Sequence, residues 1–345
     1  MESAIPKHLL RERSQPKAMP AGFRSPLPAW VARFDPLVEQ VVMAHFGAQS
    51  RDGLPSGLEH LAGRFAQKLG PKHWERARYV DARGYDTLVF IAYWDDPAAF
   101  NAWRAESGFD AWWRDPARQH EPCGYFLEVV TPTADRFETL FSSPDRPEGI
   151  ACLQAGVSGE IEEHNYWGGA RDRIPLSQVD PLAPGPKPLH ASPTDTRGER
   201  VVVPGRANLC LIRSGQDWTD TRDQERSLYL EQVQPTLAEG MRFLRDEGAP
   251  IGCLSCRYMT VVDVEGKPLE KTFGLAHFDS LANLEQWAKS HPTHLAIFRT
   301  FLKYAQDLGF QIALRLYHEV TVVPENGQYF EYVNCHPATG LLGRA

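Results

Sequence analysis

The chain has 345 residues, of which 42% are hydrophobic and 23% are charged. These fractions are close to those of globular proteins and exclude a disordered, collagen-like or coiled-coil chain. The length suits two domains or one domain with a duplicated unit. The 44 acidic residues outnumber the 37 basic ones, and the net charge of −7 argues against a large nucleic-acid footprint.

No apolar stretch reaches the ~18 residues that a membrane-spanning helix needs, and the first residues lack the apolar core of a signal peptide. We therefore expect a cytoplasmic protein that binds a small molecule, with no nucleic-acid and no membrane partner. The six cysteines are too scattered for a disulfide framework. Cys253 and Cys256 lack the second pair that a zinc ribbon requires, so we interpret them as thiols on a strand.

Two proline-rich segments punctuate the chain. Residues 1–28 contain five prolines among charged residues and predict an extended arm that lies over neighbouring structure. Residues 180–199 also contain five prolines, without a hydrophobic period, and predict a loop. We expect one structural unit over residues 29–179 and a second over residues 200–345.

The two expected units carry an internal repeat. Residues 93–113 align without gaps with residues 277–297, and both stretches have the pattern of a strand, a turn marked by aspartate and a helix. Residues 126–130 align with residues 317–321 as a later strand. The sequence predicts earlier elements in each unit: strands at 29–34 and 40–47 before a helix at 57–70, and a strand at 208–214 before a helix near 222–246.

Each unit therefore has the pattern β-α-β-α-β with added strands. This order is typical of a ferredoxin-like unit rather than of a doubly wound parallel sheet. We predict an α+β protein in which two tandem ferredoxin-like repeats pair into one body.

A duplication allows the two copies to be compared position by position. His294 aligns with Asp110, and it shares a helix face with Phe298 and Phe301. An imidazole on an apolar wall is suited to be the axial ligand of a haem iron. A core histidine bonded to the backbone fits the same spacing, and a metal pair with His291 is a weaker alternative.

His318 aligns with Leu127 and lies on the same strand face as Leu316 and Val320. A histidine on a buried strand face needs a polar partner, which makes His318 a candidate acid or base. A structural histidine remains the alternative.

Two further segments have polar patterns. Residues 158–178 combine glycines and aromatic residues with Arg171 and Arg173, as in a pocket loop, although a salt bridge at the surface explains either arginine. Ser214 and Gly215 end a strand, where a turn hydrogen bond is the alternative to a role of the serine in the site. The sequence lacks the dinucleotide-binding, P-loop, zinc-protease and nucleophile-elbow motifs.

Several segments together resemble the aldoxime dehydratases. They occur in the family's order over nearly the whole chain, together with the opening MESAI. The segments are HNYWG at 164–168, Arg173, LIRSGQDW at 211–218, ERSLYL at 225–230, SHPTHL at 290–295, LRLYHEV at 314–320 and EYVNCHPATG at 331–340. Two departures concern loops: the stretch between His294 and His318 is about three residues longer than in the family pattern, and residues 48–80 match poorly.

The resemblance implies a homodimeric lyase that uses ferrous haem b to convert an aldoxime into a nitrile and water. It also implies a fold related to chlorite dismutases and dye-decolourising peroxidases. His294 matches the proximal ligand of the haem iron, and His318 matches the distal catalytic residue. Ser214 and Arg173 match residues that hold the oxime hydroxyl, and Glu138 resembles the carboxylate that orients the distal histidine.

Three alternatives stay open at this point. A haem peroxidase or chlorite-type enzyme of the same fold would favour a different set of distal residues. A haem carrier or gas sensor would bind the cofactor without chemistry. A protein without cofactor would have both histidines in its core. His164 matches a family histidine to which we assign no role.

Overall fold

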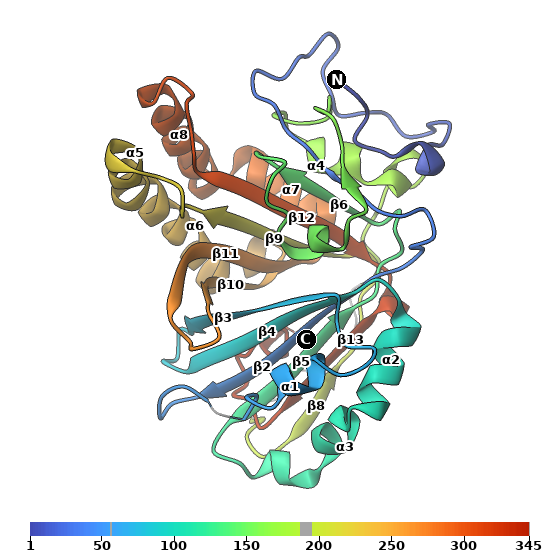
Figure 1. The fold of residues 1–345 in the computed structure, drawn as a ribbon, viewed down its shortest axis with the longest axis vertical. Helices are drawn as coiled ribbons and strands as arrows, with labels where there is room; N and C mark the ends of the chain where they lie inside the picture. Colours follow the sequence, from blue (N-terminus) through green and yellow to red (C-terminus); the bar gives the residue numbers. More distant parts are fainter. Residues whose placement is uncertain (56, 187–194, 345) are drawn as a thin grey trace.

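The structure is a computed structural model that describes residues 1–55, 57–186 and 195–344. The first half of the chain supplies a series of elements in the order β-α-β-β-α-β (Figure 1): β2 (Val42–Ser50), α1 (Leu61–Phe65), β3 (His73–Val80), β4 (Asp86–Trp94), α2 (Pro97–Glu106) with α3 (Phe109–Arg114), and β5 (Gly124–Val130).

The second half repeats this order. Its elements are β9 (Leu209–Asp217), α5 (Asp223–Leu228) with α6 (Gln234–Glu247), β10 (Cys253–Val262), β11 (Pro268–Phe278), α7 (Leu281–Ser290) with α8 (Pro292–Asp307), and β12 (Arg315–Val323). The predicted pattern thus lacked one strand in each half, β3 and β10.

The first half departs from the predicted boundaries in two places. Within the predicted strand at 29–34, only Ala32 and Arg33 form a strand, β1 (Ala32–Arg33), which pairs with β7 (Gly156–Val157). Within the predicted helix at 57–70, only α1 is helical. Glycine is a poor helix former, and this stretch contains Gly57, Gly63 and Gly70.

Eleven strands form one antiparallel sheet in the order β6-β12-β9-β11-β10-β3-β4-β2-β5-β13-β8. The four core strands of each half are arranged alike, as β12-β9-β11-β10 and β5-β2-β4-β3, and the two sets join where β10 pairs with β3. The outer strands are exchanged between the halves. β6 (Phe137–Phe141) pairs with β12, and β13 (Gln328–Val333) pairs with β5 and with β8 (Arg200–Val203).

The two halves of the sheet share one inner core. Buried side chains from β2, β4 and β5 pack in the same cluster as side chains from β9, β10 and β11. The helices lie on the outer faces, with α2 and α3 over the first half and α6, α7 and α8 over the second (Figure 1). The halves exchange strands and share a core. Separating them would therefore break strand pairs of the sheet and expose the core.

The predicted helix near 222–246 is divided into three parts. Between α5 and α6 the chain forms a π-helical turn, η5 (Tyr229–Val233). Pro235 lies in the first turn of α6 and has no amide hydrogen to donate to the preceding turn. A π-turn accommodates this loss while the helix axis continues.

Short helices complete the described elements. They are η1 (Lys7–Leu9), η2 (Pro116–Gln119), η3 (Gly149–Leu153), α4 (Gly169–Arg173), η4 (Pro175–Gln178), η6 (Ala249–Ile251), η7 (Glu325–Gly327) and η8 (Leu342–Arg344).

The predicted arm, residues 1–28, lies against residues 160–178 of the same chain. In the predicted loop, residues 180–186 and 195–199 form neither helix nor strand, and residues 187–194 lie outside the described residues. The division into units at 29–179 and 200–345 stays a prediction.

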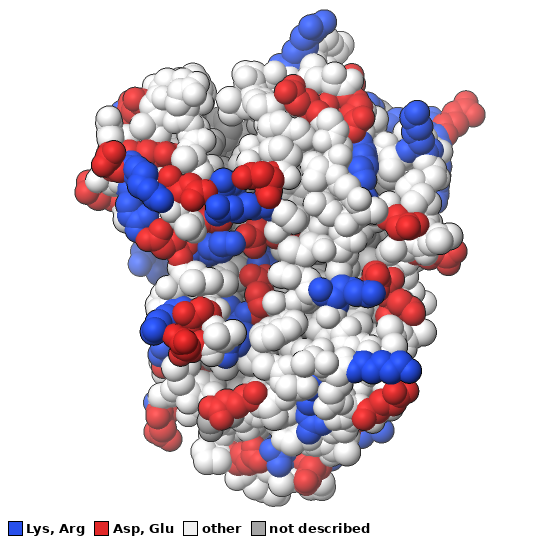
Figure 2. Space-filling view, viewed as in Figure 1, with Lys and Arg blue, Asp and Glu red and all other residues white. Residues whose placement is uncertain are grey.

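Charged side chains of both signs are spread over the visible surface. Figure 2 shows acidic and basic residues interspersed over one face of the molecule. Within the described ranges, no helix has both the length and the apolar character that crossing a bilayer demands.

Candidate active site

A pocket of about 510 Å³ lies between the outer face of the second half of the sheet and its covering helices. This volume falls within the range of ~300–1,000 Å³ that is usual for ligand sites. The sheet contributes residues from β12, β9 and β11, α6, α7 and α8 contribute apolar residues, and residues 165–170 contribute a third wall. His294, His318, Ser214 and Arg173 all line this pocket.

The sheet register explains why the pocket exists in one half only. Ser214 on β9 lies opposite His318 on β12 and opposite Gly274 on β11. The corresponding row of the first half consists of Phe46 on β2, Leu127 on β5 and Phe90 on β4. These three residues are buried within an aromatic core that also contains Trp94, Trp103 and Phe109. The second half replaces that row by two polar side chains and a glycine, which leaves space.

His318 is held by two charged partners. Its Nε2 lies 2.8 Å from Nη2 of Arg173 and 3.0 Å from Oε1 of Glu138. Arg173 also donates from Nε to Oε2 of Glu138 at 2.7 Å. The side chains of Arg173 and Glu138 are 3% and 1% exposed, so this ion pair is buried behind the pocket wall.

The two contacts favour opposite protonation states of Nε2 in His318. Arg173 can only donate, so its contact requires a lone pair on Nε2. Glu138 can only accept, so its contact becomes a hydrogen bond only when Nε2 carries a proton; among the described residues its Oε1 has no hydrogen-bond partner. Burial raises the pKa of Glu138, but Arg173 and His318 outweigh this effect and lower its pKa below the ordinary value. Glu138 is therefore an anion at neutral pH, and the pair can accommodate both forms of the imidazole.

Ser214 lies beside His318 on the same face of the sheet. Directly opposed residues of an antiparallel pair have Cβ atoms about 5 Å apart. The hydroxyl of Ser214 and the imidazole of His318 are therefore close enough to contact the same small molecule. The turn explanation of Ser214 is wrong, because β9 continues through this residue to Asp217.

His294 approaches the pocket from the covering helices. It lies in the first turn of α8, where His291 caps the helix by accepting a hydrogen bond from the backbone of Thr293. The His294 ring contacts Trp287 and Trp167 at centroid distances of 4.7 and 5.8 Å.

The surroundings of His294 fit a haem ligand. Burial lowers its pKa, which keeps the imidazole neutral and its lone pair available for a metal. Its Nδ1 atom is buried and has no hydrogen bond of good geometry among the described residues, while a backbone contact with Ala288 opposes the effect of burial and raises the pKa of the imidazole. The apolar walls around it would exclude water from a bound iron porphyrin.

Other predicted polar residues lie outside the pocket lining. Arg171 forms a half-exposed ion pair with Glu285 at 2.7 Å, as the salt-bridge alternative predicted. His164 is buried, and its Nε2 contacts the carbonyl oxygen of Leu27 at the end of the arm.

Cys253 and Cys256 are buried on β10, as predicted. Burial raises the pKa of the Cys256 thiol to about 12, so it is not a nucleophile at neutral pH. Within the described part of the chain, no cluster of three or more His, Cys, Asp or Glu residues could hold a metal ion.

Comparison with known proteins decides the family. An aliphatic aldoxime dehydratase of Pseudomonas chlororaphis is 43% identical over 347 residues, which cover 99% of this chain and 98% of the relative. Residues 44–341 match the family described as haem-containing dehydratase. The chain belongs to the haem-containing aldoxime dehydratases. Within this family, a phenylacetaldoxime dehydratase of Bacillus sp. (strain OxB-1) is 35% identical over 94% of each chain.

Solved structures of aldoxime dehydratases show the same fold. A crystal structure of one aldoxime dehydratase superimposes with a TM-score of 0.91 at 42% identity, over 99% of this chain and 98% of that chain. A complex of another with butyraldoxime gives a TM-score of 0.92 at 39% identity, over 99% and 96% of the two chains. These comparisons confirm the α+β class and the dehydration of aldoximes to nitriles, and they set aside the peroxidase, carrier and cofactor-free alternatives.

Gly274 was missed by the sequence analysis. A Cβ atom at this position would lie 2.6 Å from Sδ of Met241, so a larger residue would fill the pocket. The repeat could have identified it. If the alignment of residues 93–113 with residues 277–297 is extended by three residues toward the N-terminus, Gly274 pairs with Phe90.

Proposed function

We propose that the pocket between β12, β9 and α8 dehydrates aldoximes with His318 as general acid and then general base. The observation that carries this proposal is the position of His318 Nε2 between the guanidinium of Arg173 and the carboxylate of Glu138. A group that must be protonated in one step and neutral in the next needs neighbours that tolerate both states.

The reaction R–CH=N–OH → R–C≡N + H₂O assigns a task to each side chain. Protonated His318 gives its proton to the hydroxyl oxygen, which leaves as water when the N–O bond breaks. Neutral His318 then removes the hydrogen on carbon, which completes the C≡N bond and restores the acid. General acid catalysis of this kind contributes about 10²–10⁴-fold.

Ser214 and Arg173 orient the leaving hydroxyl in this proposal. Both line the pocket next to His318, and both carry donors whose positions are set by the strand register or by the buried pair with Glu138. Donors that are fixed before the reaction stabilise developing charge by a few kcal/mol. Glu138 positions His318 and Arg173 without contacting the substrate.

We assign the haem ligand to His294. A ferrous haem b held by His294 would supply an iron able to bind the oxime nitrogen and to donate electron density into the N–O bond. The assignment rests on the apolar walls around the imidazole and on its burial, which outweighs the backbone contact with Ala288 and lowers its pKa. We also propose that the matching halves are tandem ferredoxin-like repeats related to chlorite dismutases and dye-decolourising peroxidases, and that the protein forms a homodimer in the cytoplasm.

Two alanine variants test these roles separately. His318→Ala is expected to retain the haem Soret band and to lose at least about 100-fold in nitrile formation under anaerobic, reducing conditions. His294→Ala is expected to lose the Soret band after haem titration. Near-normal turnover by His318→Ala would show that another group is the acid, and unchanged haem spectra in His294→Ala would reject it as the ligand.

A further inference from the structure

The arm has a use beyond covering the surface. Its residues 2–19 bind the segment that carries Arg173, and they do so through two carboxylates that are almost inaccessible to solvent. Glu163 and Asp172 are 1% and 0% exposed. A buried carboxylate is costly unless it is paired and hydrogen-bonded, so the identity of its partners matters.

Glu163 links the arm to Arg173. Its carboxylate accepts hydrogen bonds from the backbone N–H of Ala4 at 2.8 Å and from Oγ of Ser3 at 3.3 Å, and it pairs with Nζ of Lys17 at 2.9 Å. The backbone oxygen of the same residue accepts a hydrogen bond from Nη1 of Arg173 at 2.6 Å. If Glu163 moves, its backbone oxygen moves with it, and the guanidinium of Arg173 loses or shifts this hydrogen bond.

Asp172 precedes Arg173 in α4 and is held from the same side. Its carboxylate accepts hydrogen bonds from the backbone N–H groups of Ala18 and Met19, each at 3.0 Å. The hydroxyl of Tyr166 donates a further bond at 2.8 Å. The arm thus supplies hydrogen-bond partners to two carboxylates: that of Glu163, whose backbone oxygen accepts from Arg173, and that of Asp172, which precedes Arg173 in the chain.

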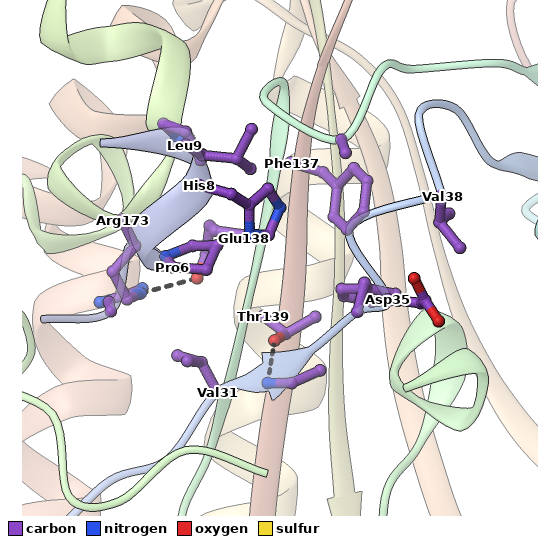
Figure 3. A pocket seen from close by; sticks show the side chains of 15 residues that line it. Pro6, His8, Leu9, Val31, Asp35, Val38, Phe137, Glu138, Thr139 and Arg173 are labelled. Atoms are coloured by element: carbon purple, nitrogen blue, oxygen red, sulfur yellow. Dashed lines mark hydrogen bonds and ion pairs between the residues drawn. The ribbon is translucent and has the colours of Figure 1, made fainter. Parts of the chain in front are cut away.

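The first part of the arm also closes the space behind Glu138. Figure 3 shows Pro6, His8 and Leu9 gathered around the dashed ion pair of Arg173 with Glu138. The pocket that remains there has a volume of about 40 Å³, enough for a very small number of water molecules. The arm therefore keeps bulk water from the rear of this pair, where it would weaken the electrostatic interaction.

We propose that the arm is a positioning element for the active site and that Lys17, by neutralising Glu163, fixes the Arg173 guanidinium against His318. This inference rests on the proposed function of Arg173. Lys17 does not touch the pocket, so its effect is transmitted through Glu163. A displacement of about 1 Å in a substrate-positioning group can cost about 100-fold in rate.

The test begins with Lys17→Met, which keeps the length of the side chain and removes its charge. We expect kcat for butyraldoxime, under anaerobic reducing conditions, to fall about ten- to hundredfold, with little change in KM or in the haem spectrum. Lys17→Arg restores the charge and is expected to restore kcat. The double variant Lys17→Met with Glu163→Gln removes both charges and is expected to recover most of kcat.

A matched control is available in the same arm. Arg11 pairs with Asp135 at 2.8 Å, and its side chain is 41% exposed, close to the 35% of Lys17, but no hydrogen bond or ion pair joins its side chain to Glu163 or Asp172. Arg11→Met removes an ion pair of the arm without touching the link to Arg173. We expect its kcat to stay within about twofold of the parent, because an exposed pair is worth only ~0–1 kcal/mol and this one has no link to Arg173.

A double-mutant cycle separates this proposal from the function on which it rests. Lys17→Met is expected to have no further effect on kcat in an Arg173→Ala background. An equal loss in both backgrounds would show that the arm acts elsewhere, and the proposal would be wrong while Arg173 kept its role. Full activity of Arg173→Ala alone would instead reject the role of Arg173 and, with it, the positioning role of Lys17.

Discussion

At the scale of single residues, the proposed chemistry depends on the two neighbours of one imidazole nitrogen. His318 Nε2 has a donor-only neighbour in Arg173 and an acceptor-only neighbour in Glu138. Neither contact alone would support a cycle that needs both protonation states. The buried ion pair between the two neighbours keeps them in place when the proton on the imidazole leaves or returns.

Replacing Glu138 by glutamine tests this balance. Glu138→Gln keeps a side chain that can bond to Arg173 but removes the anion that favours protonated His318. We expect kcat to fall about tenfold or more, because protonated His318 loses a charged hydrogen-bond partner, an interaction worth ~1.5–3 kcal/mol. The measurement is nitrile formation by the reduced enzyme at saturating aldoxime.

The haem spectrum and KM serve as controls for that variant, since Glu138 does not line the pocket that contains His294. An unchanged kcat would show that the carboxylate only supports the wall of the pocket.

The residues to which we assign the chemistry were identified from the sequence, and the residues that support them were not. His294 and His318 differ from their aligned partners in the first repeat, and short motifs mark Ser214 and Arg173. By contrast, Lys17 and Glu163 are 146 positions apart, and their contact depends on the path of the arm. No local pattern encodes such a path, because prolines and charges specify extension without specifying what the extension touches.

At the scale of elements, the duplicated unit shows how a pocket arises from a packed core. Both halves have the same strand order, so the backbone does not distinguish them. The difference lies in one row of three facing residues. In the first half the row consists of two phenylalanines and a leucine on β2, β4 and β5, and in the second half it consists of a serine, a glycine and a histidine on β9, β11 and β12. Protein cores are close-packed, so removing two aromatic rings from such a row opens a cavity.

Gly274→Val tests whether the missing side chain makes room for the cofactor. The new Cβ would lie in contact with Met241, and the branched side chain would project into the pocket. We expect a reduced haem content, by about tenfold or more in binding affinity, measured from the Soret band during titration with haem. Gly156→Val on β7 is the control, because a Cβ atom there meets nothing within 4 Å. Full haem loading of Gly274→Val would show that the cofactor lies elsewhere.

The exchanged strands explain which elements the sequence pattern could predict. The repeat identified β4, β5, β11 and β12, since their flanking turns and helices are conserved between the two copies of this chain. It did not predict that β6 pairs with β12 or that β13 pairs with β5. These pairings join residues far apart in the chain, and alternation within a strand identifies its buried face but not its neighbour.

At the scale of the whole molecule, the shared inner core contains ionisable groups that link the two halves. His45 on β2 lies opposite Glu128 on β5, and Glu128 forms two hydrogen bonds of 2.6 Å with Arg257 on β10. His277 on β11 is 1% exposed and stands near the same group. The interface between the halves is thus polar at this point and depends on the protonation state of its members.

This cluster predicts loss of stability in mild acid. Burial lowers the pKa of His45 from 6.5 to about 3 and that of His277 to about 4. Burial tends to raise the pKa of Glu128, but Arg257 outweighs it and lowers the value to about 2. In all three cases the unfolded chain binds protons at a higher pH than the folded chain does. Stability is therefore full above about pH 6.5 and falls as the pH decreases.

The expected slope follows from these two histidines. Between about pH 6 and pH 4.5, each contributes roughly 1.4 kcal/mol per pH unit to the loss of unfolding free energy, or roughly 2.7 kcal/mol per unit together. Urea unfolding at a series of fixed pH values measures this slope. His277→Gln at the same haem loading is expected to reduce the slope by about half, whatever its effect on stability at pH 7. Equal slopes for the two proteins would mean that His277 titrates normally in the folded state, and that the inner core admits water at the junction of β10 and β11.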